Sequence, residues 1–285
     1  MYDLTNEKTV KQILARHGIV LTKARGQNFL INPSVCPRMA QVCGATKADG
    51  VLEIGPGVGV LTAELAKVAG KVVSVEIDKG LPPVLAETLA DFDNVTIIEG
   101  DILKTNVKQL LASHFDGMKV AVCANLPYYI TTDILMMLLE SGLPFASITV
   151  MVQKEFANRL CAPVGSRESG AVTVGAAYRA KCEKMFTVSA GSFLPAPKVD
   201  STVMRLTPYE TPPVDVTDET WFFKVVKAGF NQRRKTLTNA LQAGLGIAKE
   251  QTAAVLEGMG LPATARIEQL DLQGLAHLAN GLKSE

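Results

Sequence analysis

Short apolar runs alternate with helix-compatible segments from residue 51 onward, and this order restricts the fold more than any other feature of the chain. The strand-like runs are residues 51–54, 72–77, 95–99, 120–124 and 148–152. Between them, residues 61–68, 81–90 and 132–139 have the apolar spacing of helices. Because strands that alternate with helices favour parallel pairing, the sequence predicts an α/β fold in which helices cover both faces of a parallel sheet.

The flanks of this region predict further elements and a second domain. Residues 7–17 have a helical pattern, and residues 170–177, 182–188 and 199–206 are predicted to be further strands of the large domain. The stretch 207–213 is rich in proline and typical of a linker, and helical patterns follow at 218–229, 232–244, 249–257 and 271–282. We therefore predict a large α/β domain at 1–207 and a small helical domain at 208–285.

Composition excludes several classes of protein. The longest apolar stretches are much shorter than the ~18 residues that indicate a membrane helix, and the polar amino terminus lacks a secretory signal pattern. The cysteines form no Cys-x-x-Cys pair and the histidines are scattered, so neither a disulfide framework nor a metal site is indicated. We expect a soluble, cytoplasmic monomer with free thiols, no metal and no membrane partner.

Charge is distributed unevenly along the chain, although the net charge is only +1. Residues 39–152 contain 7 Lys/Arg and 13 Asp/Glu, whereas the remainder contains 22 and 15. A basic group without an acidic residue among them lies between positions 221 and 240, at Lys224, Lys227, Arg233, Arg234 and Lys235. Such side chains can bind the phosphates of a nucleic acid, and a solvated helix face is the alternative interpretation.

A glycine-rich turn follows the first strand, in the order Gly55-Pro56-Gly57-Val58-Gly59. A dinucleotide fingerprint would need its third glycine at position 60, which is valine, and no Gly-Lys-Ser/Thr of a Walker loop follows. Glu53 adds negative charge where a diphosphate would be repelled. Because glycine lets the backbone approach a ligand closely, the turn favours a cationic nucleoside without phosphates, and S-adenosylmethionine is a ligand of this kind.

Acidic residues at the ends of the next two strands are predicted to complete this cofactor site. Glu76 lies 21 residues after Gly55, where an acidic residue commonly binds the ribose hydroxyls. Asp101 follows the third strand and is placed to accept a hydrogen bond from the adenine amine. The neighbouring Ile77 and Ile102 are assigned to the same site. The alternative is that the glycines form ordinary turns and the carboxylates cap helices.

The segment Asn125-Leu126-Pro127-Tyr128 directly follows the run 120–124 and predicts a site for a flat, amine-bearing base. Pro127 has no N–H and favours an extended Leu126, whose carbonyl can then stay unpaired. This carbonyl and the Asn125 side-chain oxygen could accept hydrogen bonds from an exocyclic amine, and the Tyr128 ring offers a stacking face. Adenine fits, since two acceptors at N6 would localise its lone pair. The alternative is a turn capped by Asn125 with Tyr128 in the core.

With these motifs, the chain resembles the KsgA-type ribosomal RNA adenine N6,N6-dimethyltransferases over nearly its whole length. Residues 26–30 (GQNFL), 193–201 (FLPAPKVDS) and 230–237 (FNQRRKTL) also carry the resemblance. It implies a Rossmann-like class I S-adenosylmethionine-dependent methyltransferase domain, in which Asn28 and Leu30 contact the methionine end of the cofactor and Gln27 lies with them. Asn125 would touch both cofactor and target. The chain departs from its relatives at 80–83 (GLPP), which concerns the start of a helix and not the site.

The resemblance also implies the substrate and a role for Phe193. The substrate would be two adjacent adenosines near the 3′ end of 16S rRNA in the immature small subunit, each methylated twice. A rigid proline-rich loop after Phe193 could hold its ring opposite Tyr128 and sandwich a flipped base, whereas a core phenylalanine beside a turn is the alternative. Adenine N6 would then attack the sulfonium methyl directly, with catalysis from positioning and desolvation.

Two other functions stay open on the sequence. A macrolide-resistance methyltransferase that acts on 23S rRNA shares the core motifs, although residues 230–237 and the chain length favour the small-subunit enzyme. A factor that binds immature small subunits as an assembly checkpoint, with methylation incidental, belongs to a different class. For an enzyme, we expect residues 1–207 to be catalytic and residues 208–285 to bind rRNA.

Overall fold

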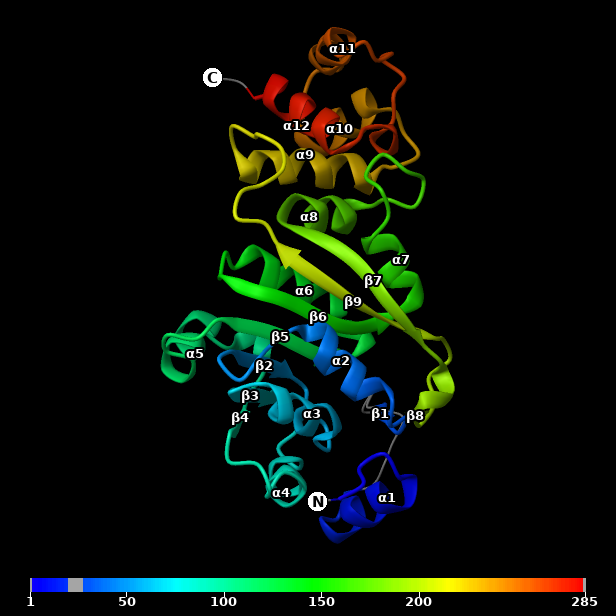
Figure 1. Ribbon diagram of the computed structural model, residues 1–285. Coiled ribbons are helices and arrows are strands. Elements are labelled where there is room, and N and C mark those ends of the chain that lie inside the picture. The colour runs from blue at the N-terminus through cyan, green and yellow to red at the C-terminus, as the bar shows by residue number, and fades with distance from the viewer. Residues whose placement is uncertain (1, 20–27, 284–285) are drawn as a thin grey trace. The chain divides into compact units, whose positions relative to one another are not determined.

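The central sheet of the protein has seven strands in the order β4-β3-β2-β5-β6-β9-β7 (Figure 1). A computed structural model describes residues 2–19 and 28–283. The strands are β2 (Gly50–Ile54), β3 (Lys71–Glu76), β4 (Val95–Glu99), β5 (Val120–Asn125), β6 (Phe145–Gln153), β7 (Ala180–Val188) and β9 (Ser201–Pro208). The strands from β2 to β6 pair in parallel, and β9 is antiparallel to β6. The predicted α/β fold is confirmed, with an antiparallel strand added to its parallel sheet.

Helices cover this sheet in the first of two compact units, which comprises residues 1–157 and 183–208. They are α1 (Glu7–Arg16), α2 (Val35–Cys43), α3 (Val60–Val68), α4 (Pro82–Thr88), α5 (Val107–His114) and α6 (Thr131–Glu140). Helix α7 (Lys154–Leu160) follows at the end of β6 and continues into the second unit. Met39 of α2 and Leu65 of α3 share an apolar core with Val51 and Val72 of the sheet. Figure 1 shows α2 in front of the sheet and α6 behind it, so helices lie on both faces.

A second, short sheet joins two segments that are far apart in the sequence. In it, β1 (Phe29–Leu30) pairs antiparallel with β8 (Phe193–Leu194), so that Leu30 is opposite Phe193. Residues 29–30 and 193–194, which belong to two motifs far apart in the sequence, therefore meet in the folded chain. Gln27, one of the predicted cofactor contacts, lies outside the described residues.

The second unit is helical and comprises residues 158–182 and 209–285. Its helices are α8 (Ala171–Arg179), α9 (Glu219–Asn231), α10 (Leu237–Leu245), α11 (Lys249–Gly258) and α12 (Leu272–Gly281). At its core, the ring of Phe222 lies 5.4 Å from Tyr178 and 4.9 Å from Phe223, centroid to centroid. The division differs from the one predicted at 207/208, because residues 158–182 pack with the carboxyl-terminal helices.

The strand predicted at residues 170–177 is wrong, since this segment forms most of α8. The Gly170 N–H donates to Thr173 Oγ1 at 2.9 Å and starts the helix. Val174 and Tyr178, four residues apart, then face the core of the second unit. The run of Val and Ala residues suits a buried helix as well as a strand, and packing against α9 decides between them.

Two classes of feature are missing from residues 2–19 and 28–283. No helix in this part of the chain is long and apolar enough to cross a membrane. Nor do three or more His, Cys, Asp or Glu side chains gather there as a metal site would require. Cys36, Cys43 and Cys123 are buried thiols of the first unit.

Candidate active site

A cavity opens at the carboxyl ends of β2, β3 and β5, within the first unit. The chain runs outward from β2 to β3 and β4 and then returns to β5, on the other side of β2. Such a reversal of strand order leaves a crevice in which α/β proteins bind ligands. The predicted site residues that line the cavity are Asn28, Leu30, Glu53, Gly55, Gly57, Glu76, Ile77, Asn125, Leu126, Pro127, Tyr128 and Phe193.

The glycine turn between β2 and α3 has a backbone that only glycine adopts readily. Gly55, Gly57 and Gly59 have φ angles of 69°, 61° and 92°, all in the left-handed region. A Cβ built on Gly55 would meet no atom within 4 Å, whereas one on Gly59 would come within 3.1 Å of the Leu89 side chain. Gly55 therefore exposes its backbone to the cavity. Gly59 lies outside the cavity lining and allows close packing at the start of α3.

Glu76 holds the glycine turn against the end of β3. Its carboxylate accepts hydrogen bonds from Gly57 N at 3.3 Å and from Asp78 N at 2.8 Å. The side chain is 4% exposed, and this burial raises its pKa, against the opposing effect of the backbone hydrogen bonds. A buried carboxylate at the cavity wall is suited to accept hydrogen bonds from ligand hydroxyls.

Glu53, one strand away, has one carboxylate oxygen satisfied and one not. Its Oε2 accepts from Thr62 Oγ1 at 2.7 Å and from Ser74 Oγ at 2.5 Å, but no described residue donates to Oε1. Burial is nearly complete and raises the pKa of Glu53 to about 7, although the two hydroxyl hydrogen bonds lower it. An unpaired buried acceptor beside a cavity is costly without a ligand that donates to it.

The raised pKa of Glu53 predicts a specific pH dependence of stability. Below its unfolded pKa near 4.5, Glu53 is protonated in both states, and above it the unfolded chain has released the proton, which the folded protein keeps until the pH rises through about 7. The free energy of unfolding should therefore fall, relative to that of Glu53→Gln, by about 1 kcal/mol between pH 6 and pH 8. Urea denaturation of both proteins across this range measures the difference. Parallel pH profiles would contradict the prediction.

The Asn125 side chain lies at the end of β5 and is oriented by the amino-terminal segment. Its Nδ2 donates to the Asn28 carbonyl at 3.5 Å, which leaves its Oδ1 available as an acceptor. The Leu126 N–H donates to Met151 O at 3.3 Å, and no described residue donates to the Leu126 carbonyl. This agrees with the expectation that the carbonyl before Pro127 stays unpaired, and its role as an acceptor for a ligand stays a prediction. Two acceptors from adjacent residues stand at the same cavity.

Two aromatic rings flank these acceptors. Tyr128 is half-buried, and its hydroxyl shares a 2.7 Å hydrogen bond with Ser201 Oγ; burial raises its pKa while this bond opposes the shift. Phe193 is 3% exposed and belongs to the apolar core, yet it also lines the cavity. The core interpretation and the site interpretation of Phe193 are therefore compatible.

Besides Gly59, two predicted cofactor contacts, Asp101 and Ile102, do not line the cavity. Asp101 accepts from Leu103 N at 3.0 Å and caps the short helix Ile102–Lys104, with Lys104 Nζ at 3.7 Å from its other oxygen. Ile102 is buried. In this structure Asp101 therefore caps a helix, as the alternative interpretation of the sequence expected. Its contact with adenine stays a prediction.

The cavity also contains residues that the sequence reading missed. They include Phe29, Pro56, Val58 and Tyr129. Phe29 packs over the glycine turn, with its ring 3.4 Å from the position of a Cβ on Gly57. Because successive side chains of a strand point to opposite faces, Phe29 would be expected to point away from the face that carries Asn28 and Leu30. Its position at the cavity is therefore seen only in the folded chain, where β1 pairs with β8. Tyr129 directly follows the predicted Tyr128, and no other feature of the sequence indicated that it lines the cavity.

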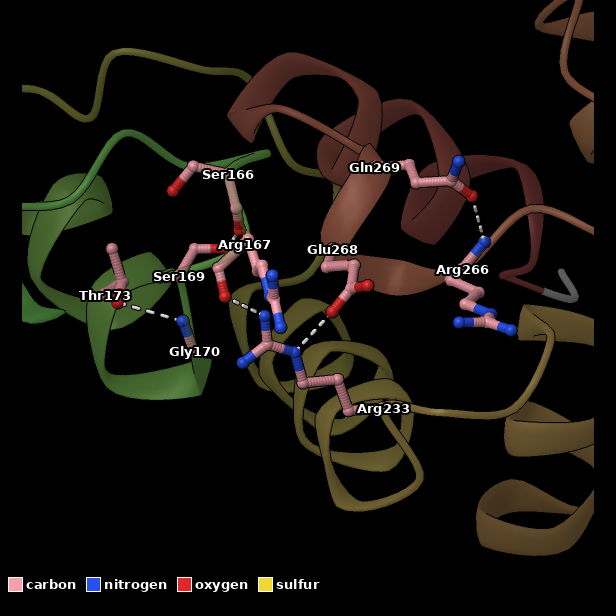
Figure 2. A network of polar contacts seen from close by, with 9 residues as sticks. All are labelled: Ser166, Arg167, Ser169, Gly170, Thr173, Arg233, Arg266, Glu268 and Gln269. Carbon is pink, nitrogen blue, oxygen red and sulfur yellow. Dashed lines mark hydrogen bonds and ion pairs between the residues drawn. The ribbon is translucent and has the colours of Figure 1, made fainter.

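In the second unit, the predicted rRNA-binding residues fall into two groups. Those with exposed side chains are Lys224, Lys227, Arg234 and Lys235. Figure 2 shows that Arg233, in contrast, points into a network within the unit, where its guanidinium donates to the Glu268 carboxylate and to the Arg167 carbonyl. This arrangement favours a structural role for Arg233, which ties the loop before α8 to the end of α9.

Matched variants of the neighbouring arginines should separate these roles. Arg233→Ala leaves the Glu268 carboxylate and the Arg167 carbonyl without their donor, so thermal unfolding should show a loss of about 1 kcal/mol. Arg234→Ala should leave stability unchanged and weaken rRNA binding. The slope of the logarithm of the binding constant against the logarithm of the salt concentration should become smaller by about one. Equal loss of stability in the two variants would contradict the assignment.

Comparison with known proteins gives a consistent result over the whole chain. Residues 21–280 match the family described as ribosomal RNA adenine dimethylase. The ribosomal RNA small subunit methyltransferase A of Shouchella clausii is 45% identical over 99% of this chain and 96% of its own length. That of Geobacillus thermodenitrificans is 44% identical over 98% and 97%.

Two solved structures are similar in fold and, more distantly, in sequence. A dimethyladenosine transferase from Plasmodium falciparum has a TM-score of 0.74 and 27% identity, over 87% of this chain and 95% of that one. The 23S rRNA methyltransferase ErmE has a TM-score of 0.69 and 27% identity, over 90% and 99%.

Proposed function

Since the chain belongs to the ribosomal RNA adenine dimethylase family, we propose that it transfers methyl groups from S-adenosylmethionine to N6 of two adjacent adenosines near the 3′ end of 16S rRNA. Each adenosine receives two methyl groups, and the substrate is the immature small ribosomal subunit in the cytoplasm. One observation carries the proposal: a single cavity joins the glycine turn and Glu76 to the two acceptors at Asn125 and Leu126.

The residues at the glycine end of the cavity fit S-adenosylmethionine. The Glu76 carboxylate is suited to the ribose hydroxyls, and the exposed Ile77 side chain is suited to the adenine face. The buried, unpaired Oε1 of Glu53 favours a ligand that carries a hydrogen-bond donor or a positive charge at this point over a ligand that carries a phosphate. Gly55 leaves open space where any Cβ would enter the cavity. When bound, the cofactor supplies an electrophilic methyl group on a sulfonium with a neutral leaving group.

The residues at the other end fit the target base. The Asn125 Oδ1 and the Leu126 carbonyl accept the two hydrogens of an adenine amine, which localises the N6 lone pair and orients it toward the glycine end. Tyr128, fixed by its hydrogen bond to Ser201, stacks on the flipped base with Phe193 nearby. No general base is required before attack, so these residues act by positioning and by exclusion of water.

The exposed basic residues of the second unit supply affinity that does not depend on sequence. Lys224, Lys227, Arg234 and Lys235 contact phosphates of the rRNA, while the first unit selects the base. The proposed enzyme acts as a monomer. It needs no metal, because positioning and the methyl donor supply the chemistry.

Small-subunit rRNA is preferred over large-subunit rRNA as the substrate because of the relatives. Curated proteins named for the small subunit are 43–45% identical to the chain, whereas the structure named for 23S rRNA is 27% identical. A role as a non-catalytic assembly factor would leave the acceptors at Asn125 and Leu126 without a use.

Transfer of labelled methyl groups to purified subunits tests the proposal. Small subunits that lack these modifications should accept about four methyl groups each, and digestion should locate them as N6,N6-dimethyladenosine at two adjacent positions. Large-subunit rRNA serves as the comparison substrate. Preferential labelling of large-subunit rRNA would contradict the proposed substrate. Binding of small subunits without any methyl transfer would favour the role as an assembly factor.

A further inference from the structure

The two most exposed large apolar side chains of the described residues line the same cavity. Tyr129 is 73% exposed and Ile77 is 63% exposed. Large apolar groups left open at the wall of a cavity usually mark a surface that a ligand covers. Ile77 follows Glu76 and belongs to the glycine end, where it is accounted for by the cofactor. Tyr129 lies at the other end, where the proposed base site does not use it.

The backbone around Tyr129 is held firmly although its side chain is not. The short helix Tyr128–Ile130 is closed by a hydrogen bond from Ile130 N to Pro127 O at 3.3 Å, and Thr131 Oγ1 donates to the same carbonyl at 3.0 Å. The adjacent Tyr128 is fixed through Ser201. Among the described residues, none forms a hydrogen bond or a ring contact with the Tyr129 side chain. A fixed backbone thus presents an uncovered aromatic ring at the rim of the cavity.

We propose that Tyr129 stacks on the base next to the flipped adenosine and is a specificity-determining residue for adjacent adenosines. The inference rests on the proposed function. When one adenosine leaves the stack, its neighbour loses a stacking partner, which costs a few kcal/mol for the flip. An aromatic ring that replaces the lost partner recovers about 1–3 kcal/mol. The adjacent tyrosines therefore contact different bases: Tyr128 stacks on the target base and Tyr129 stacks on its neighbour.

This role explains why the neighbour should be a purine. The stacking energy grows with the area of the base, so an adenosine beside the target gains more from the Tyr129 ring than a pyrimidine does. Because both adenosines of the pair are targets in turn, each serves as the stacking neighbour of the other. The pair, rather than a single adenosine, is then the unit that the rim of the cavity recognises.

A double-mutant cycle between enzyme and substrate tests the inference. With unmethylated small subunits, Tyr129→Ala should lower kcat/KM for methyl transfer about tenfold, whereas Tyr129→Phe should stay within about twofold of the unchanged enzyme. Small subunits in which one adenosine of the pair is replaced by uridine should be methylated more slowly by the unchanged enzyme. Tyr129→Ala should cause a smaller loss on that substrate than on the natural pair, because the stacking interaction is already weakened.

Two controls keep the result specific. Tyr209→Ala removes another exposed tyrosine, at 42%, from the second unit and should leave kcat/KM unchanged. The Kd of S-adenosylhomocysteine, measured by calorimetry, should be the same for Tyr129→Ala and the unchanged enzyme. An unaltered kcat/KM in Tyr129→Ala, an equal loss in Tyr129→Phe, or an undiminished loss on the uridine substrate would each overturn the inference. Absence of methyl transfer by the unchanged enzyme would instead refute the proposed function.

Discussion

Replacement of Asn125 by alanine is expected to reduce the rate of methyl transfer by about 10²–10³-fold, the size of effect seen when one preorganised polar group is removed from a reaction centre. The side-chain oxygen of Asn125 is one of only two acceptors proposed for the N6 hydrogens, and alanine cannot replace it. The lone pair of N6 would stay delocalised in the ring. Single-turnover transfer of labelled methyl groups to small subunits measures the effect.

Binding should survive in the same variant, because the phosphate contacts proposed for the second unit are far from Asn125 in the sequence and belong to another compact unit. The Kd of small subunits should therefore change by less than about threefold. Asn125→Asp is an informative companion, since it keeps the acceptor but loses the donor to the Asn28 carbonyl. An Asn125→Ala enzyme that still dimethylates rRNA at a normal rate would sink the proposed mechanism.

The parallel part of the fold could be predicted because its signals are local. The strands from β2 to β6 are apolar runs, and helical patterns lie between β2 and β3, between β3 and β4, and between β5 and β6. Once the strands are known to be parallel, their carboxyl ends must share one edge of the sheet. The convergence of Gly55, Glu76 and Asn125 on one cavity follows from this edge and needs no knowledge of side-chain packing.

What could not be predicted depends on partners distant in the sequence. The segment 170–177 is predicted from the sequence to be a strand, but it forms most of α8 (Ala171–Arg179) because Tyr178 packs on Phe222, more than 40 residues later. Arg233 looked like its exposed neighbour Arg234, and only the fold brings Glu268 to it. A residue type at a given position defines its possible interactions, whereas distant contacts select one of them.

Asp101 illustrates a limit of a different kind. A short acidic side chain after a strand can accept from a ligand or from the next backbone N–H groups, and both uses produce the same sequence pattern. In the structure the carboxylate accepts from Leu103 N. Glu76, which has one more methylene, accepts backbone hydrogen bonds and still lines the cavity. The position of each carboxylate relative to the cavity, which only the fold determines, separates the two cases.

Replacement of Glu76 by alanine is expected to weaken S-adenosylmethionine binding by about 10²-fold, because hydrogen bonds to a charged acceptor each contribute about 1.5–3 kcal/mol. The two ribose hydroxyls would lose their common carboxylate. Isothermal calorimetry with S-adenosylmethionine measures the change. Glu99→Ala is a matched control, since Glu99 pairs with Glu76 across β3 and β4, is exposed and lies outside the cavity lining.

A second variant separates the loss of a ligand contact from damage to the glycine turn. Burial raises the pKa of Glu76, which means that the folded protein bears a cost for this carboxylate that its backbone hydrogen bonds do not fully offset. Glu76→Gln relieves this cost and keeps one carbonyl oxygen for Gly57 N, but its amide NH2 cannot accept from Asp78 N as the second carboxylate oxygen does. Because these two effects oppose each other, its free energy of unfolding at pH 8 should change by less than about 1 kcal/mol. Its affinity for S-adenosylmethionine should nevertheless fall. A variant that lost affinity and stability together would show that Glu76 acts through the turn, whereas loss of affinity alone identifies a residue kept for binding at the expense of stability.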